Sequence, residues 1–270
     1  MEQHRYHSIV FALLSAVEIE LTMQVYLHFP FAVCILPALL FFLSFLLESM
    51  LSFRNAMEAK TKLSLPYIFD DLKHIHVSHH LILPTLLYIS ITSFIILNGS
   101  SLLTQFVIVL SVITLYALFE GQQTSIRHDF MFDEYLHYIY DSIKIIIYFL
   151  LIDSTIAAYK IGDINLVAVF AISEAVAFLL FLLIISRKRE LNTAGILYIF
   201  FASMLSSILV LLMTTLGSAT IILALMASVI YYLLIGIIHH KINASLTAGI
   251  VLEYILIAGI ILVVLTGISF

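Results

Sequence analysis

The feature that most constrains the fold is a succession of nine apolar runs, each about as long as a bilayer is thick. The hydrocarbon core of a bilayer, about 30 Å deep, is crossed by about 20 apolar residues in a helix. A chain that is 63% hydrophobic and only 11% charged cannot cover its apolar surface in water, so lipid is the expected solvent. We predict an all-α polytopic transmembrane helical bundle, a single integral membrane domain over residues 1–270. The expected spans are 9–29, 31–53, 81–97, 102–119, 139–158, 166–186, 194–216, 219–238 and 246–268.

The distribution of lysine and arginine predicts the orientation of these spans. Nine spans with the N-terminus inside place ten cations on the cytoplasmic side and only Lys160 outside, as the positive-inside rule requires. The two long connections, 54–80 and 120–138, then become cytoplasmic loops. The first is expected to contain a short amphipathic helix in the membrane interface, beginning near Pro66. The ten inside cations are Arg5, Arg54, Lys60, Lys62, Lys73, Arg127, Arg187, Lys188, Arg189 and Lys241.

Several classes of function are excluded by what the sequence lacks. The net charge is −5, with no basic patch to neutralise phosphates, so nucleic acid is not an expected partner. Cys34 is the only cysteine, which excludes an internal disulfide and a cluster of thiolate ligands. The motifs of phosphate loops, zinc proteases and serine hydrolases do not occur. No catalytic residue is therefore predicted.

Histidines gather in the segment KHIHVSHH, residues 73–80. The spacing H-x-x-H-H resembles one histidine box of the membrane-bound fatty acid desaturases and hydroxylases, which implies a metal centre of iron or zinc facing the cytoplasm. The other histidine groups lack such spacing, and histidine at a helix end is also an ordinary interfacial residue. A stripe of Asp129, Asp133, His137 and Asp141 could orient an imidazole or simply face solvent. The candidate metal ligands are His76, His79, His80, His128, His137, His239 and His240.

Glutamates inside the predicted spans are a second lead, because a charge at bilayer depth costs at least about 2.5 kcal/mol unless it finds a partner. Lys144 is not expected to neutralise them, since Asp141 lies three residues before it. The carboxyl groups could bond serine, threonine or tyrosine between helices, or could line a path for a proton or cation. The candidates are Glu18, Glu20, Glu48, Glu174 and Glu253.

The C-terminal third carries a family resemblance in YYLLIGIIHHKINASLTAGIVLEYILIAG, residues 231–259. A tyrosine-rich helix, a turn at Gly236–His240 and the pair Glu253 and Tyr254 resemble the closing segment of a family of uncharacterised multi-pass proteins of candidate-phylum bacteria. The resemblance implies a helical bundle in a bacterial cytoplasmic membrane, and no activity.

Three hypotheses of function follow. The first is a non-enzymatic scaffold or accessory subunit that binds another membrane protein or a second copy of itself. The second is a proton- or cation-coupled transporter of small solutes that uses the intramembrane glutamates, and the third is a lipid-modifying enzyme that uses the histidines and a metal. Small residues on the seventh span suit close helix packing in lipid; they are Ala202, Ser203, Ser206 and Ser207.

Overall fold

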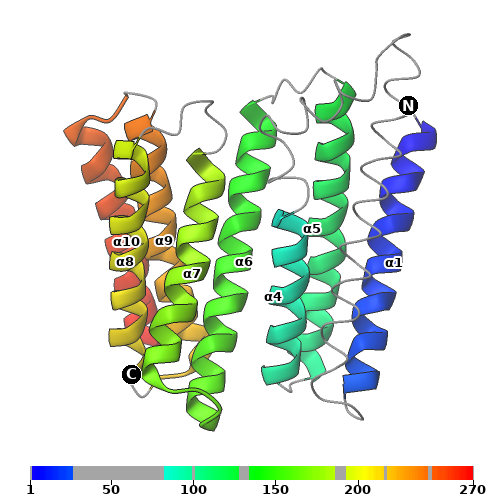
Figure 1. The fold of residues 1–270 in the computed structure, drawn as a ribbon, viewed down its shortest axis with the longest axis horizontal. Coiled ribbons are helices and arrows are strands. Elements are labelled where there is room, and N and C mark those ends of the chain that lie inside the picture. Colours follow the sequence, from blue (N-terminus) through cyan, green and yellow to red (C-terminus); the bar gives the residue numbers. More distant parts are fainter. Residues whose placement is uncertain are drawn as a thin grey trace. The chain divides into compact units, whose positions relative to one another are not determined.

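The computed structural model is all-helical over the residues that it describes, which confirms the predicted fold class (Figure 1). The chain divides into two compact units, Met1–Lys144 and Ile145–Phe270. The described residues are 2–26, 82–98, 101–127, 134–185, 193–215, 218–242 and 245–269.

The first unit contains three helices that pack against one another: α1 (Glu2–Tyr26), α4 (Leu83–Asn98) and α5 (Ser101–Arg127). Phe11 of α1 and Phe119 of α5 bring their ring centroids within 5.8 Å. The side chains of α4 are mostly buried, and its hydroxyl groups bond carbonyls one turn back in the same helix, as Thr92 does with Tyr88. Such bonds satisfy polar groups where no water is available.

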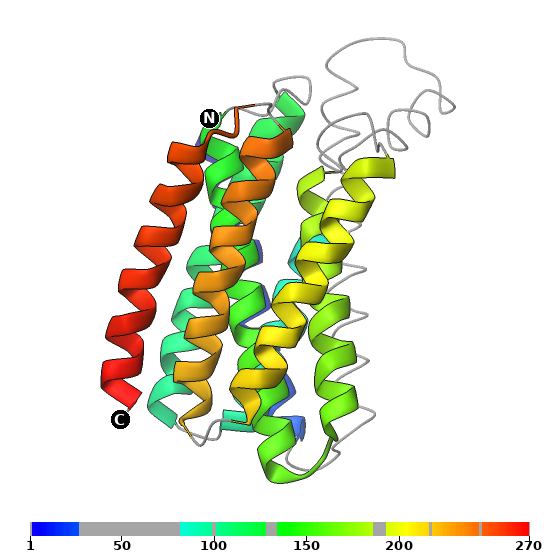
Figure 2. The ribbon, with the colours of Figure 1, turned by 90° about the vertical axis from the view of Figure 1, so that its left-hand side faces the viewer.

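The second unit contains the helices from α6 onward. They are α6 (Glu134–Ile161, which enters this unit at Ile145), α7 (Leu166–Ile185), α8 (Thr193–Thr214), α9 (Thr220–Ile242) and α10 (Ala248–Ser269). Successive helices alternate in direction, and α7 packs against α8, α8 against α9, and α9 against α10 (Figures 1 and 2).

The turn from α6 to α7 shows how local sequence fixes this alternation. Gly162 adopts φ +93°, its N–H donates to Tyr159, and the N–H of Asp163 donates to Ala158, both at 3.0 Å. This is the Schellman pattern, in which glycine ends a helix because a left-handed residue is needed there. The side chain of Asn165 then accepts from the N–H of Ala168 at 2.9 Å and caps α7.

Six of the described helices are long and apolar enough to cross a membrane, and they correspond to six of the predicted spans: Leu102–Gly121, Ile139–Ile161, Leu166–Ile184, Gly195–Thr214, Thr220–Lys241 and Ala248–Gly267. The described parts of the predicted runs 9–29 and 81–97 are also helical, in α1 up to Tyr26 and in α4 from Leu83, but α4 has only 16 residues. The run 31–53 and the interfacial helix near Pro66 lie outside the described residues. The count of nine and the orientation therefore stay predictions.

Two boundaries differ from the sequence-based expectation. The predicted turn at Gly236–His240 is wrong, because α9 continues as a helix to Ile242. A Cβ added at Gly236 would overlap the ring of Tyr254 on α10, so this glycine serves close helix packing rather than a turn. Helix also extends into the connection 120–138 from both sides, since α5 ends at Arg127 and α6 begins at Glu134.

Candidate functional site

The candidate site is a polar cluster in the second unit, formed by the buried side chains of Tyr148, Ser203 and Ser206 and by the partly buried Glu174. Glu174 is the ninth residue of the 20-residue helix α7, about 12 Å from its start at 1.5 Å per residue. Its carboxyl oxygen Oε1 lies 2.6 Å from the hydroxyl of Ser203 on α8. The other oxygen, Oε2, is buried and has no hydrogen bond among the described residues. The cluster thus places a carboxyl group halfway through a candidate span.

The serines of α8 lie on one face of the helix because they are three and four residues apart. Ser203, Ser206 and Ser207 are all 0 or 1% exposed, and Ser207 donates to the backbone carbonyl of Ser203 at 2.9 Å. Short side chains on this face let α7 approach α8 closely. The predicted role of these three residues in helix packing is confirmed, whereas Ala202 is only partly buried.

Tyr148 connects α6 to the same face of α8. Its hydroxyl lies 2.7 Å from that of Ser206. Its ring stacks on Tyr231 of α9, with centroids 4.2 Å apart and planes 11° apart, and Phe181 of α7 completes the aromatic group at 4.8 Å from Tyr231. Tyr148, Phe181 and Tyr231 are fully buried. Side chains from four helices, α6 to α9, therefore form the cluster, and its polar atoms lie next to the three packed aromatic rings.

Four of the five predicted glutamates lie among the described residues, two in each unit. Glu18 and Glu20 lie on α1 in the first unit and are partly buried. In the second unit, Glu174 bonds Ser203 between α7 and α8, whereas Glu253 is exposed on α10. Glu48 lies outside the described residues. Of the two alternatives for these carboxyl groups, a hydrogen bond to a serine of a neighbouring helix is present for Glu174.

Asp153 was not predicted as a site residue, although its side chain is fully buried in the second unit. It is the fifteenth residue of the candidate span Ile139–Ile161. An aspartate within the apolar segment IIIYFLLIDSTIAA is the signal that could have identified it, because ionisable residues inside spans are rare and costly. The neighbouring Ser154 and Thr155 donate to the carbonyls four residues before them.

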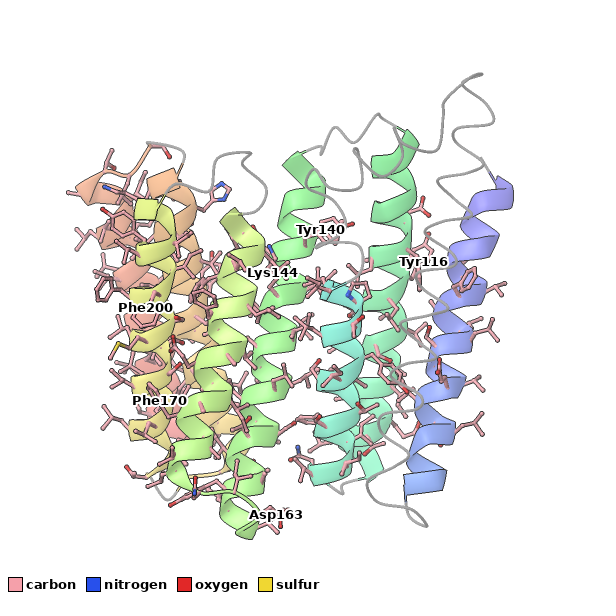
Figure 3. All side chains as sticks on the ribbon, viewed as in Figure 1. Tyr116, Tyr140, Lys144, Asp163, Phe170 and Phe200 are labelled. Carbon is pink, nitrogen blue, oxygen red and sulfur yellow. The ribbon has the colours of Figure 1, made fainter. Side chains whose placement is uncertain are left out.

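The other polar candidates lie on α6, at the end of α9 or outside the described side chains. Lys144 contacts Asp141 at 3.0 Å, as predicted, and lies one turn after Tyr140 on α6 (Figure 3). His239 and His240 occupy the last turn of α9, where the helix dipole favours a basic group, and His240 Nδ1 lies 3.0 Å from the hydroxyl of Ser245. Within the described residues no three potential ligands are close enough to hold a metal ion. For His76, His79, His80, His128 and His137 no side chain is described.

The fold and the cluster together define a class: this is a multi-pass helical membrane protein, with six helices able to span a bilayer. The comparisons with known proteins go no further. No protein-family model, no curated protein and no solved structure matches the chain. The resemblance of residues 231–259 to a bacterial family therefore stays a prediction.

Proposed function

We propose that the protein is a non-enzymatic scaffold or accessory subunit that binds a second membrane protein through α10. The observation that carries this proposal is the poor burial of α10. In its candidate span, Ala248–Gly267, only 6% of the apolar stretch is buried, whereas 33 to 67% is buried in the other five candidate spans. Among the described helices, α10 packs against α9 at the edge of the second unit, where Figure 2 shows the two side by side.

An exposed side of α10 carries a carboxyl group among apolar side chains. Tyr254 and the buried Ala258 lie toward α9, where the ring of Tyr254 is 5.9 Å from that of Tyr232. Another stripe recurs at i, i+4, i+7 and i+11 and is exposed throughout. We name it the outer face of α10; it consists of Glu253, Ile257, Ile260 and Val264.

Lipid solvates the apolar side chains of the outer face of α10 well, but its hydrocarbon offers no hydrogen-bond donor or cation to the carboxyl group of Glu253. A carboxyl group in the span gains from a hydrogen-bond donor or a cation on a neighbouring helix, and polar side chains are known to join helices in membranes. The expected occupant is therefore a transmembrane helix of another polypeptide that presents a donor to Glu253. A second copy of this chain would meet the same requirement if the carboxyl groups were protonated and bonded to each other.

The test is cross-linking from the outer face of α10 in native membranes. Cys34→Ser gives a chain without cysteine, and Ile260→Cys then carries a photo-reactive maleimide on the exposed face. Ala258→Cys is the matched control because residue 258 is buried. We expect a covalent adduct with a second polypeptide from position 260 and a much weaker one from 258. Adducts only within the chain, or only with lipid, would contradict the proposal.

A second candidate, proton- or cation-coupled transport, is favoured by the position of Glu174 between α7 and α8. A carboxyl group there could load and release a cation during transport. Glu174→Gln in proteoliposomes should slow the decay of an imposed pH gradient, followed with a pH-sensitive dye, whereas Glu253→Gln should not. Equal decay in wild-type and Glu174→Gln vesicles would count against transport. The metal-dependent enzyme stays a prediction, because most of its histidines lie outside the described side chains.

A further inference from the structure

The hydroxyl of Ser203 lies within hydrogen-bonding distance of two acceptors. Its oxygen is 2.6 Å from Oε1 of Glu174 and 2.9 Å from the carbonyl oxygen of Phe200, three residues earlier on α8. Phe200 is labelled on α8 in Figure 3. A serine hydroxyl has one hydrogen, so it can donate a full hydrogen bond to only one of the two. If Ser203 donates to the carbonyl of Phe200, the hydrogen between Ser203 and Glu174 must come from the carboxyl group of Glu174.

Two arrangements of hydrogen atoms are possible. In the first, Ser203 donates to an ionised Glu174. The second oxygen of the carboxylate, Oε2, then shares the negative charge while it is buried without a hydrogen bond among the described residues. In the second, Glu174 is a neutral acid whose O–H donates to Ser203, and Ser203 donates to the carbonyl of Phe200. Each hydroxyl hydrogen then has one acceptor, and no charge is buried.

The surroundings favour the second arrangement. An unpaired charge at the centre of a span costs about 2.5–3.5 kcal/mol on insertion scales, and a buried anion with an unsatisfied oxygen loses further free energy. The titratable side chains in this cluster are the phenols of Tyr148 and Tyr231, which carry no positive charge. Asp153, also buried on α6, is an acid and likewise supplies no cation. Lys144 on α6 contacts Asp141 at 3.0 Å.

We propose that Glu174 is a proton-binding site, at which the carboxyl group holds a hydrogen and donates it to Ser203. The ligand proposed for this site is a proton; the described residues bring no three His, Cys, Asp or Glu side chains together. Ser203 is the positioning residue: its own hydrogen goes to the Phe200 carbonyl, which leaves its oxygen free to accept. The inference depends on neither the α10 interface nor transport of a solute.

The test is infrared spectroscopy of the full chain in lipid nanodiscs, which separates the C=O stretch of a protonated carboxyl group from the bands of a carboxylate. Glu174→Gln should remove protonated-carboxyl absorbance equivalent to one group per chain. Asp163→Asn is the control, because Asp163 lies in an exposed turn after α6, and it should leave that component in place. Loss of carboxylate absorbance in Glu174→Gln, with the protonated band unchanged, would overturn the proposal.

A second variant keeps the inference testable if Glu174→Gln does not fold. Ser203→Ala removes the acceptor of the Glu174 hydrogen but retains the carboxyl group, so the protonated C=O band should shift in frequency without losing area. If Ser203 were instead the donor to an ionised Glu174, the carboxylate bands would shift and the protonated band would not. Circular dichroism on the same samples reports whether the helices are intact. The cross-linking from Ile260→Cys should be unaffected by Ser203→Ala, so failure of one proposal is distinguishable from failure of the other.

Discussion

Gly162 holds a backbone conformation, φ +93°, that residues with a Cβ rarely adopt. A Cβ there would meet no atom within 4 Å, so the cost of substitution is one of backbone strain alone. Gly162→Ala should lower the free energy of unfolding by about 1–2 kcal/mol, measured by thermal unfolding in a mild detergent. Gly259→Ala is the control, because Gly259 is helical and also has open space around it; an equal loss in both variants would refute the argument.

Ser206 and Tyr148 share a buried hydrogen bond between α8 and α6. Interhelical hydrogen bonds in membrane proteins contribute about 0.6 kcal/mol on average in double-mutant cycles. We expect a coupling of this size between Ser206→Ala and Tyr148→Phe, read from unfolding midpoints. Ser228→Ala is a suitable control, since the Ser228 hydroxyl donates to Ala224 within its own helix. Additive effects of Ser206→Ala and Tyr148→Phe would show that the 2.7 Å contact does not stabilise the unit.

At the scale of the helices, α9 and α10 meet where Gly236 lies against the ring of Tyr254. Gly236→Ala should push these helices apart and lower the free energy of unfolding by about 1–3 kcal/mol, the usual cost of overpacking. The same substitution in a Tyr254→Ala background should cost much less, because the overlapping ring is gone. Thermal unfolding of the four chains of this cycle measures the difference. A cost that is the same with and without the ring would disprove the role assigned to Gly236.

The sequence predicted helices better than it predicted where they end or what they bury. Six spans followed from apolar length alone, since hydrocarbon requires about 20 residues per crossing. The end of α9 was misplaced because a glycine and two histidines look like a turn until the neighbour of Gly236 is known. Only part of the cluster could be predicted. Glu174 was identified because it is an ionisable residue within an apolar run. The pairing of Glu174 with Ser203 and of Tyr148 with Ser206 depends on which helix faces come together. Apolar runs carry no information about that.

A multi-pass bundle of this kind has lipid around its helices and successive connections on opposite sides of the bilayer. The exposed turn at Asp163 (Figure 3) and the exposed Ser245 after α9 are separated by three candidate spans. An odd number of crossings puts them on opposite sides. The positive-inside distribution predicts which side each takes, with Asp163 beside Lys160 outside and Ser245 beside Lys241 in the cytoplasm.

The most direct test of this claim is labelling of Asp163→Cys and Ser245→Cys, each in the Cys34→Ser background, with a maleimide that cannot cross membranes. We predict that intact cells label position 163 at once and position 245 only after the membrane is permeabilised. Labelling of both positions from the same side of an intact membrane would contradict the arrangement of spans, and with it the placement of Glu174 inside the bilayer.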